Sequence, residues 1–115
     1  MTQRLVFALD LVDDADLIAT YEDFHRPGAV WPEVLADIRA RGVQQMEIWR
    51  TGDRLVMVCE VAEDFSRSVP AGHQSKRWEE MMDRFQRRLP HASPGEKWTP
   101  MRRIFDLTAG NGSSS

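Results

Sequence analysis

The chain has 115 residues, of which 42% are hydrophobic and 29% charged, and its formal net charge at pH 7 is −3. This length and composition are typical of a single soluble globular domain with one core. Acidic and basic residues are interspersed without a basic stripe, which argues against nucleic acid as a partner. No apolar run suits a signal peptide or a membrane span, so we expect a cytoplasmic protein that does not bind membranes.

The sequence gives no sign of a metal centre or a cofactor site. The only cysteine, Cys59, allows no intrachain disulfide and argues against most cysteine-based metal sites. The three histidines at positions 25, 73 and 91 are not spaced as metal ligands. A phosphate-binding glycine loop and a nucleophile elbow are both missing. These absences count against nucleotide use and acyl-enzyme hydrolysis, and the sequence implies no metal or cofactor.

The first part of the chain predicts one strand and two helices. Residues 4–11 are rich in apolar side chains and predict a mostly buried strand. The acidic run at 13–16 is typical of a helix start, and a helix should follow from Leu17 to about His25. A second helix is expected to begin near Val30, with proline in its first turn and a glycine after its end.

The second part predicts a hairpin, a long helical stretch and a closing strand. Residues 43–50 and 54–61 should form two strands joined by a short Thr-Gly-Asp connection. A helical stretch is predicted over 63–89, broken near its proline and glycine, and a last strand over 101–108. We expect one domain over residues 1–109 and a disordered tail at 110–115.

The resulting order, β-αα-ββ-α-β, predicts an α+β fold of the ferredoxin-like type. This fold has a four-stranded antiparallel sheet with the helices on one face. On the other face we expect apolar residues from each strand, with Phe7, Met57, Val61 and Phe105 as candidates. A half-apolar face needs cover, which predicts a homodimer.

Tyr21 and His25 are the first candidates for chemistry. They lie four residues apart on one predicted helix and should be neighbours on the same face. Histidine titrates closest to neutral pH and tyrosine offers a hydroxyl, a pair suited to proton transfer on a neutral polar substrate. Taken by themselves, the two residues are explained more simply by core packing of the tyrosine and a helix end at the histidine.

Four tryptophans, at positions 31, 49, 78 and 98, are the next candidates. An indole ring stacks on the C–H face of a sugar and donates one hydrogen bond. Core packing is the simpler interpretation for Trp31 and Trp49. Trp78 has charged neighbours on both sides in the sequence and could equally line a site, whereas Trp98 could lie at a site edge or a dimer contact.

Read in order, several motifs resemble the L-rhamnose mutarotase family. They are YxxxH at Tyr21–His25, WPE at 31–33, RW followed closely by Met at 77–82, and IFDL at 104–107. The resemblance runs over residues 4–108, nearly the whole chain. It implies a dimeric α/β barrel of ferredoxin-like subunits and a small cofactor-free enzyme that interconverts the α and β anomers of a 6-deoxy sugar.

The resemblance also implies roles for individual residues. His25 matches the family's acid/base histidine and Tyr21 its substrate-binding tyrosine, which would orient the sugar or relay a proton. Trp78 matches the first of two adjacent tryptophans that hold the sugar, and Glu79 stands in place of the second. We expect Trp78, Glu79 and Trp31 to bind substrate.

Two departures from the family pattern fall at the expected site. Glu79 replaces an indole, and two extra residues separate His25 from Trp31. They make L-fucose at least as good a candidate as L-rhamnose. The same barrel also carries cofactor-free monooxygenases, and a small-metabolite binding module is a further alternative. Fold alone does not separate these functions.

Overall fold

The computed structural model describes residues 2–65 and 72–109. Residues 66–71, where we expected most of a helix break, and the tail at 110–115 lie outside the described residues. The elements in chain order are β1 (Gln3–Leu11), α1 (Ala15–Phe24), α2 (Pro32–Ala40), β2 (Val43–Thr51), β3 (Arg54–Val61), α3 (His73–Met82), β4 (Gln86–Arg87), β5 (Thr99–Pro100) and a 3₁₀ turn (Leu107–Ala109).

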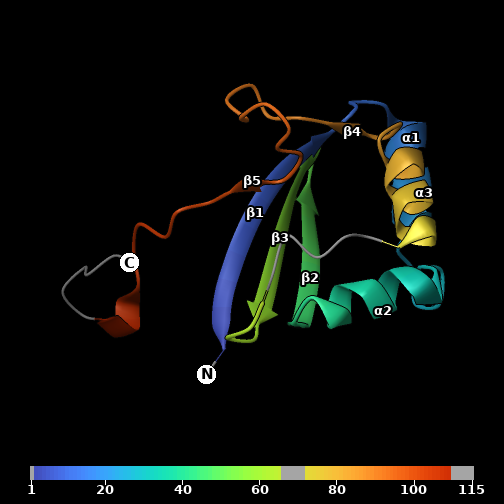
Figure 1. Ribbon diagram of the computed structural model, residues 1–115. Helices are drawn as coiled ribbons and strands as arrows, with labels where there is room; N and C mark the ends of the chain where they lie inside the picture. The colour runs from blue at the N-terminus through green and yellow to red at the C-terminus, as the bar shows by residue number, and fades with distance from the viewer. Residues whose placement is uncertain (1, 66–71, 110–115) are drawn as a thin grey trace.

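The strands form one antiparallel sheet in the order β2-β3-β1-β4, and β5 also pairs with β1. Figure 1 shows all three helices on the same side of this sheet. The order is that of a ferredoxin-like fold, so the predicted α+β class is confirmed. None of the helices in the described ranges is long and apolar enough to cross a membrane.

Local sequence signals explain the first helix and the hairpin. The carboxylate of Asp14 caps α1 by accepting hydrogen bonds from the backbone amides of Asp16 and Leu17, each at 3.0 Å. Gly52 joins β2 to β3 with a φ of 56°, a left-handed value that glycine adopts without steric cost. Both elements therefore form close to where the sequence predicts them.

The core lies between the sheet and the helices. Leu9, Leu11 and Leu55 of the central strands are at most 1% exposed. Burial of each such side chain favours folding by about 1.5–3 kcal/mol. A larger cluster joins these strands to the helices, and a smaller one lies further along the sheet around Phe7 and Cys59. The larger cluster contains the tyrosine and Trp78, which places two candidate site residues inside the core.

Phe7, Met57 and Val61 were expected on the sheet face away from the helices, and this prediction is wrong for all three. Phe7 pairs with Met57, and Phe7 is four residues before Leu11, which packs against the helices in the larger cluster, so both lie on the face toward the helices. Val61 belongs to the same cluster as Phe7. Phe105, the fourth candidate, lies outside any strand and is 66% exposed. β1 is apolar on both faces, so alternation could not tell which set faces inward.

The helix predicted up to residue 89 ends at Met82. Phe85 is buried in the core, and the backbone at 86–87 pairs with Asp10 and Leu11 as β4. Helical periodicity continued past this point in the sequence, but the unpaired edge of β1 offered backbone hydrogen bonds that a helix could not satisfy. Tertiary structure overrode local propensity here.

The predicted closing strand at 101–108 is also wrong. Pairing with β1 occurs earlier, at residues 99–100, and residues 101–106 form no regular element. Figure 1 shows this segment leaving the sheet and running away from the body of the molecule. We call residues 101–109 the C-terminal arm.

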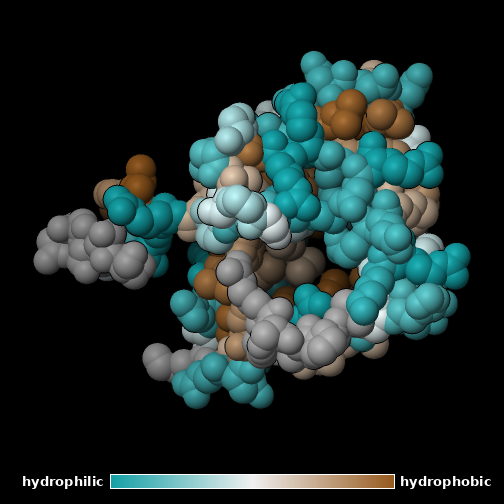
Figure 2. All heavy atoms as spheres, turned by 45° about the horizontal axis from the view of Figure 1, so that its top comes forward, coloured by the Kyte–Doolittle hydropathy of each residue, from teal (hydrophilic) through white to brown (hydrophobic). Residues whose placement is uncertain are grey.

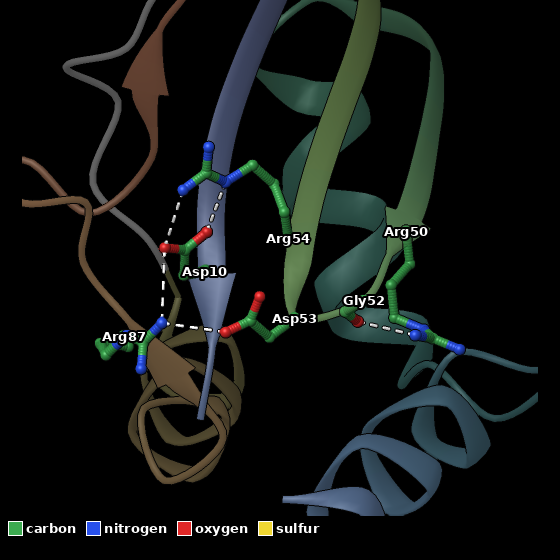
Figure 3. A network of polar contacts seen from close by, with 6 residues as sticks. All are labelled: Asp10, Arg50, Gly52, Asp53, Arg54 and Arg87. Carbon is green, nitrogen blue, oxygen red and sulfur yellow. Dashed lines mark hydrogen bonds and ion pairs between the residues drawn. The ribbon is translucent and has the colours of Figure 1, made fainter. Parts of the chain in front are cut away.

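Asp10 ties three strands together on the other face of the sheet. The Arg54 guanidinium binds both carboxylate oxygens, at 2.7 and 3.1 Å, and Arg87 lies 3.6 Å away (Figure 3). Arg87 also contacts Asp53 at 3.0 Å. The Arg54 hydrogen bonds hold the pKa of the Asp10 carboxyl below its usual range. This network explains why a buried strand can contain a carboxylate.

Candidate active site

A cavity of about 640 Å³ lies between the three helices and the β2–β3 hairpin. Figure 2 shows a hollow in one face of the molecule with apolar residues inside it. The apolar lining includes Ile48 and Met57 from the strands, and Tyr21, His25 and Trp78 come from the helical side.

His25 is anchored at the end of α1. Its Nδ1 lies 2.7 Å from the backbone carbonyl oxygen of Tyr21, one helical turn earlier. A carbonyl oxygen only accepts hydrogen bonds, so Nδ1 must carry the proton. The lone pair of the neutral ring is therefore on Nε2. The backbone fixes both the tautomer and the orientation of this histidine.

Tyr21 lies against His25, with the two ring centroids 4.4 Å apart. Its side chain is in the core, and its hydroxyl oxygen accepts a hydrogen bond from Nε2 of Gln86 at 3.2 Å. Burial raises the pKa of Tyr21 to about 12, partly opposed by that hydrogen bond. The phenol therefore keeps its proton at neutral pH and can serve as a hydrogen-bond donor.

The raised pKa of Tyr21 predicts a loss of stability in alkali. The folded protein holds the phenol proton up to about pH 12, whereas an unfolded tyrosine loses it near 10.0. The free energy of unfolding should therefore keep its full value below pH 10. It should fall by roughly 3 kcal/mol as the pH rises to 12. Urea unfolding of wild type and Tyr21→Phe at several pH values checks this, because the variant should lack that part of the pH dependence. Parallel curves for the two proteins would contradict it.

Trp78 joins the cavity to the core. It is 5% exposed, lines the cavity and meets three other rings edge to face. Those rings belong to Phe24, His25 and Trp31, with centroids 6.0, 5.6 and 5.2 Å away. Trp31 supports Trp78 and is not among the residues that line the cavity. The structure thus brings four of the five predicted site residues to one cavity, with Trp31 behind them.

Glu79 lines the cavity and is paired with a lysine that sequence reasoning missed. Lys97 Nζ lies 2.6 Å from Glu79 and 2.7 Å from Asp83, and its side chain is only 18% exposed. This lysine comes from the loop before β5, far from Glu79 in the sequence. Its charge keeps the Glu79 carboxylate oriented and favours a role as hydrogen-bond acceptor over one as base.

The other tryptophans take different places. Trp98 lines the cavity and contacts both core clusters, so it is a site-edge and core residue at once. Trp49 is 63% exposed on β2 and borders a smaller hollow of about 310 Å³ that also reaches Tyr21 and His25. The core interpretation of Trp49 is therefore wrong.

Two further polar residues of the cavity escaped sequence reasoning. Asp37 accepts hydrogen bonds from Ser75 Oγ at 2.5 Å and from the Gly72 amide at 2.9 Å, which hold its pKa below the usual range. The periodicity around Gln86 predicts a helix, whereas this residue lies in β4. No motif marks either residue.

Within residues 2–65 and 72–109, no group of three or more His, Cys, Asp or Glu side chains could hold a metal ion.

Comparison with known proteins decides the family. The family model described as L-rhamnose mutarotase matches residues 4–107 of the chain. This chain belongs to the L-rhamnose mutarotase family. It is therefore a mutarotase, an enzyme of the isomerase class.

Two relatives support this membership of the L-rhamnose mutarotase family. An "L-fucose mutarotase" of Xanthomonas campestris pv. campestris is 49% identical over 111 residues, covering 92% of this chain and 89% of the relative. A crystal structure of an L-rhamnose mutarotase from Formosa agariphila matches with a TM-score of 0.66. It is 19% identical and covers 90% of this chain and 97% of that one, so it supports the fold. Neither relative is named as an oxygenase or a binding module.

Proposed function

We propose that this mutarotase interconverts the α and β anomers of L-fucose, with L-rhamnose as the second candidate. The observation that carries the proposal is the pair of groups at the cavity: a histidine whose lone pair is on Nε2, beside a phenol that keeps its proton. One group can accept a proton while the other donates one. The 49% identity to a protein named L-fucose mutarotase favours L-fucose over L-rhamnose.

Ring opening uses the two groups together. His25 Nε2 removes the proton from O1 as the C1–O5 bond breaks and C1 becomes the aldehyde carbon. Tyr21 supplies its phenol proton to O5, which becomes a hydroxyl. Rotation about C1–C2 turns the other face of the aldehyde toward O5. Ring closure then reverses both transfers and restores the histidine and the phenol, so atoms and protons balance.

The remaining site residues hold the sugar. Trp78 presents an indole beside His25, suited to the C–H face of the ring. Glu79, held by Lys97, accepts a hydrogen bond from a sugar hydroxyl. Trp31 acts indirectly by supporting the Trp78 ring. A carboxylate in this place favours a substrate recognised by its hydroxyls.

NMR saturation transfer between the anomeric signals tests the proposal. The rate of exchange between the α and β anomers is measured for L-fucose and for L-rhamnose, with and without the protein. We expect faster exchange with L-fucose and a smaller effect with L-rhamnose. The substrate assignment fails if L-rhamnose responds more strongly, and the whole proposal fails if neither sugar responds.

We also propose that the enzyme is a cytoplasmic homodimer and that residues 1–109 act as one domain. Ile104, Phe105 and Leu107 of the C-terminal arm are 79%, 66% and 80% exposed, and Figure 2 shows apolar residues on this arm apart from the main body. A second copy would cover them.

Light scattering after gel filtration tests the homodimer. Wild type should have the mass of two chains, and the double variant Ile104→Ser/Phe105→Ser should shift toward one. Arg102→Ser, on the same arm, serves as the matched control and should stay dimeric. A wild-type protein with the mass of one chain would contradict the dimer.

A further inference from the structure

Gln86 lies in the short strand β4 and contacts the phenol of Tyr21. Its backbone pairs with Leu11 of β1, and its side chain lines the main cavity. Nε2 donates a hydrogen bond to the Tyr21 hydroxyl oxygen at 3.2 Å. Oε1 is buried and has no hydrogen-bond partner in the part of the chain that the structure describes.

Gln86 is the donor in this contact and the Tyr21 oxygen is the acceptor, so the phenol O–H is directed away from Gln86. The phenol oxygen accepts from Nε2, so its own O–H is not used by Gln86. Within the described residues, no protein acceptor takes the Tyr21 O–H. The free proton therefore remains available to a ligand oxygen in the cavity that both residues line.

The unpaired carbonyl of Gln86 shows that the amide is a poor choice for stability alone. A buried acceptor without a partner destabilises the fold, and an apolar residue of similar size would avoid that cost. A buried polar group left unpaired at the wall of a cavity is a candidate for a functional role.

We propose that Gln86 is a positioning residue of this site: its amide holds the Tyr21 oxygen as an acceptor and so presents the phenol proton to the ring oxygen of the sugar. The inference rests on the proposed mutarotase mechanism, in which Tyr21 donates to O5. Gln86 itself acts through Tyr21 and moves no proton.

Three variants at this position separate positioning from packing. Gln86→Leu removes the amide donor, and we expect kcat to fall about tenfold with little change in KM, as for one lost orienting hydrogen bond. Gln86→Glu places a carboxylate that accepts the phenol proton itself, and we expect a loss of roughly 10–100-fold at neutral pH. Gln86→Met keeps the length and provides a second apolar variant should Gln86→Leu fold poorly.

The pH profile of Gln86→Glu provides a readout that packing would not move. A protonated carboxyl can donate to the phenol oxygen as the amide does. The rate of Gln86→Glu relative to wild type should therefore rise as pH falls. In a Tyr21→Phe background the Leu and Glu variants should have equal rates, because the phenol that they influence is gone. Gln3→Leu, on β1, is the matched control and should leave the rate unchanged.

A second readout does not depend on activity. Tyr21 is the only tyrosine of the chain, so isotope-labelled tyrosine gives a single phenol signal in NMR. We expect this signal to shift in all three Gln86 variants and to stay in place in Gln3→Leu. If the wild type is active and the Gln86 variants have the same rate and the same tyrosine signal as the wild type, this inference alone is overturned. A wild type inactive on both sugars would overturn the proposed function, and the role of Gln86 with it.

Discussion

Replacing His25 with alanine is expected to slow anomer exchange by about 10²–10⁴-fold, the usual contribution of one positioned acid–base group. The reason is geometric: Nδ1 is committed to a backbone carbonyl, so the free Nε2 is the only ring nitrogen that can take the proton from O1. Saturation transfer on the purified variant measures the rate, and circular dichroism checks the fold.

Two further variants give this experiment its controls. His25→Asn retains an amide N–H that can donate to the Tyr21 carbonyl but has no basic nitrogen, so it should lose as much activity as the alanine variant. His91→Ala changes an exposed histidine of the later loop and should keep the wild-type rate. A folded His25→Ala protein with the wild-type rate would exclude histidine as the acid–base group.

Replacing Trp78 with alanine is expected to lower the free energy of unfolding by about 3–5 kcal/mol, as for other buried aromatic residues. Trp78 is 5% exposed and belongs to the main core cluster, so its removal leaves a large void beneath the site. The same change removes one wall of the cavity, so KM for the sugar should also rise. Urea unfolding gives the stability, and exchange rates at several sugar concentrations give KM.

Trp78→Phe separates the two effects. A phenyl ring fills most of the core volume but offers a smaller face to the sugar, so stability should recover further than KM. Trp49→Ala removes an indole that is 63% exposed and should change stability by no more than about 0.5 kcal/mol. If Trp78→Ala were as stable as Trp49→Ala, Trp78 would not be a core residue in solution.

The parts of the fold set by local chemistry were predictable. The acidic cap of α1 and the short glycine turn between β2 and β3 are visible in the sequence, and both elements form there. The four-residue spacing of Tyr21 and His25 predicts neighbours, and their rings do lie together. These features depend on residues close in the chain, which is why pattern reasoning finds them.

The parts set by distant contacts were not predictable. β4 and β5 have two residues each and exist because β1 has an edge to pair with, which no local pattern encodes. The same holds for the cavity. Lys97 reaches Glu79 from the following loop, and Gln86 reaches Tyr21 across 65 positions of sequence. Both residue types are common on surfaces, so nothing in the sequence distinguishes them from solvent-exposed side chains.

The central place of β1 has a consequence for biosynthesis. β1 leaves the ribosome before its partners β3, β4 and β5, and the ion pair from Asp10 to Arg54 already spans 44 positions. Contacts so distant in sequence form slowly, because closing the long intervening loop costs conformational entropy before the contact is made. The growing chain therefore carries an apolar strand with unpaired edges until these partner strands have been made. Such a segment favours aggregation during translation, and the finished sheet lowers that risk by pairing one edge of β1 with β3 and part of the other with β4 and β5.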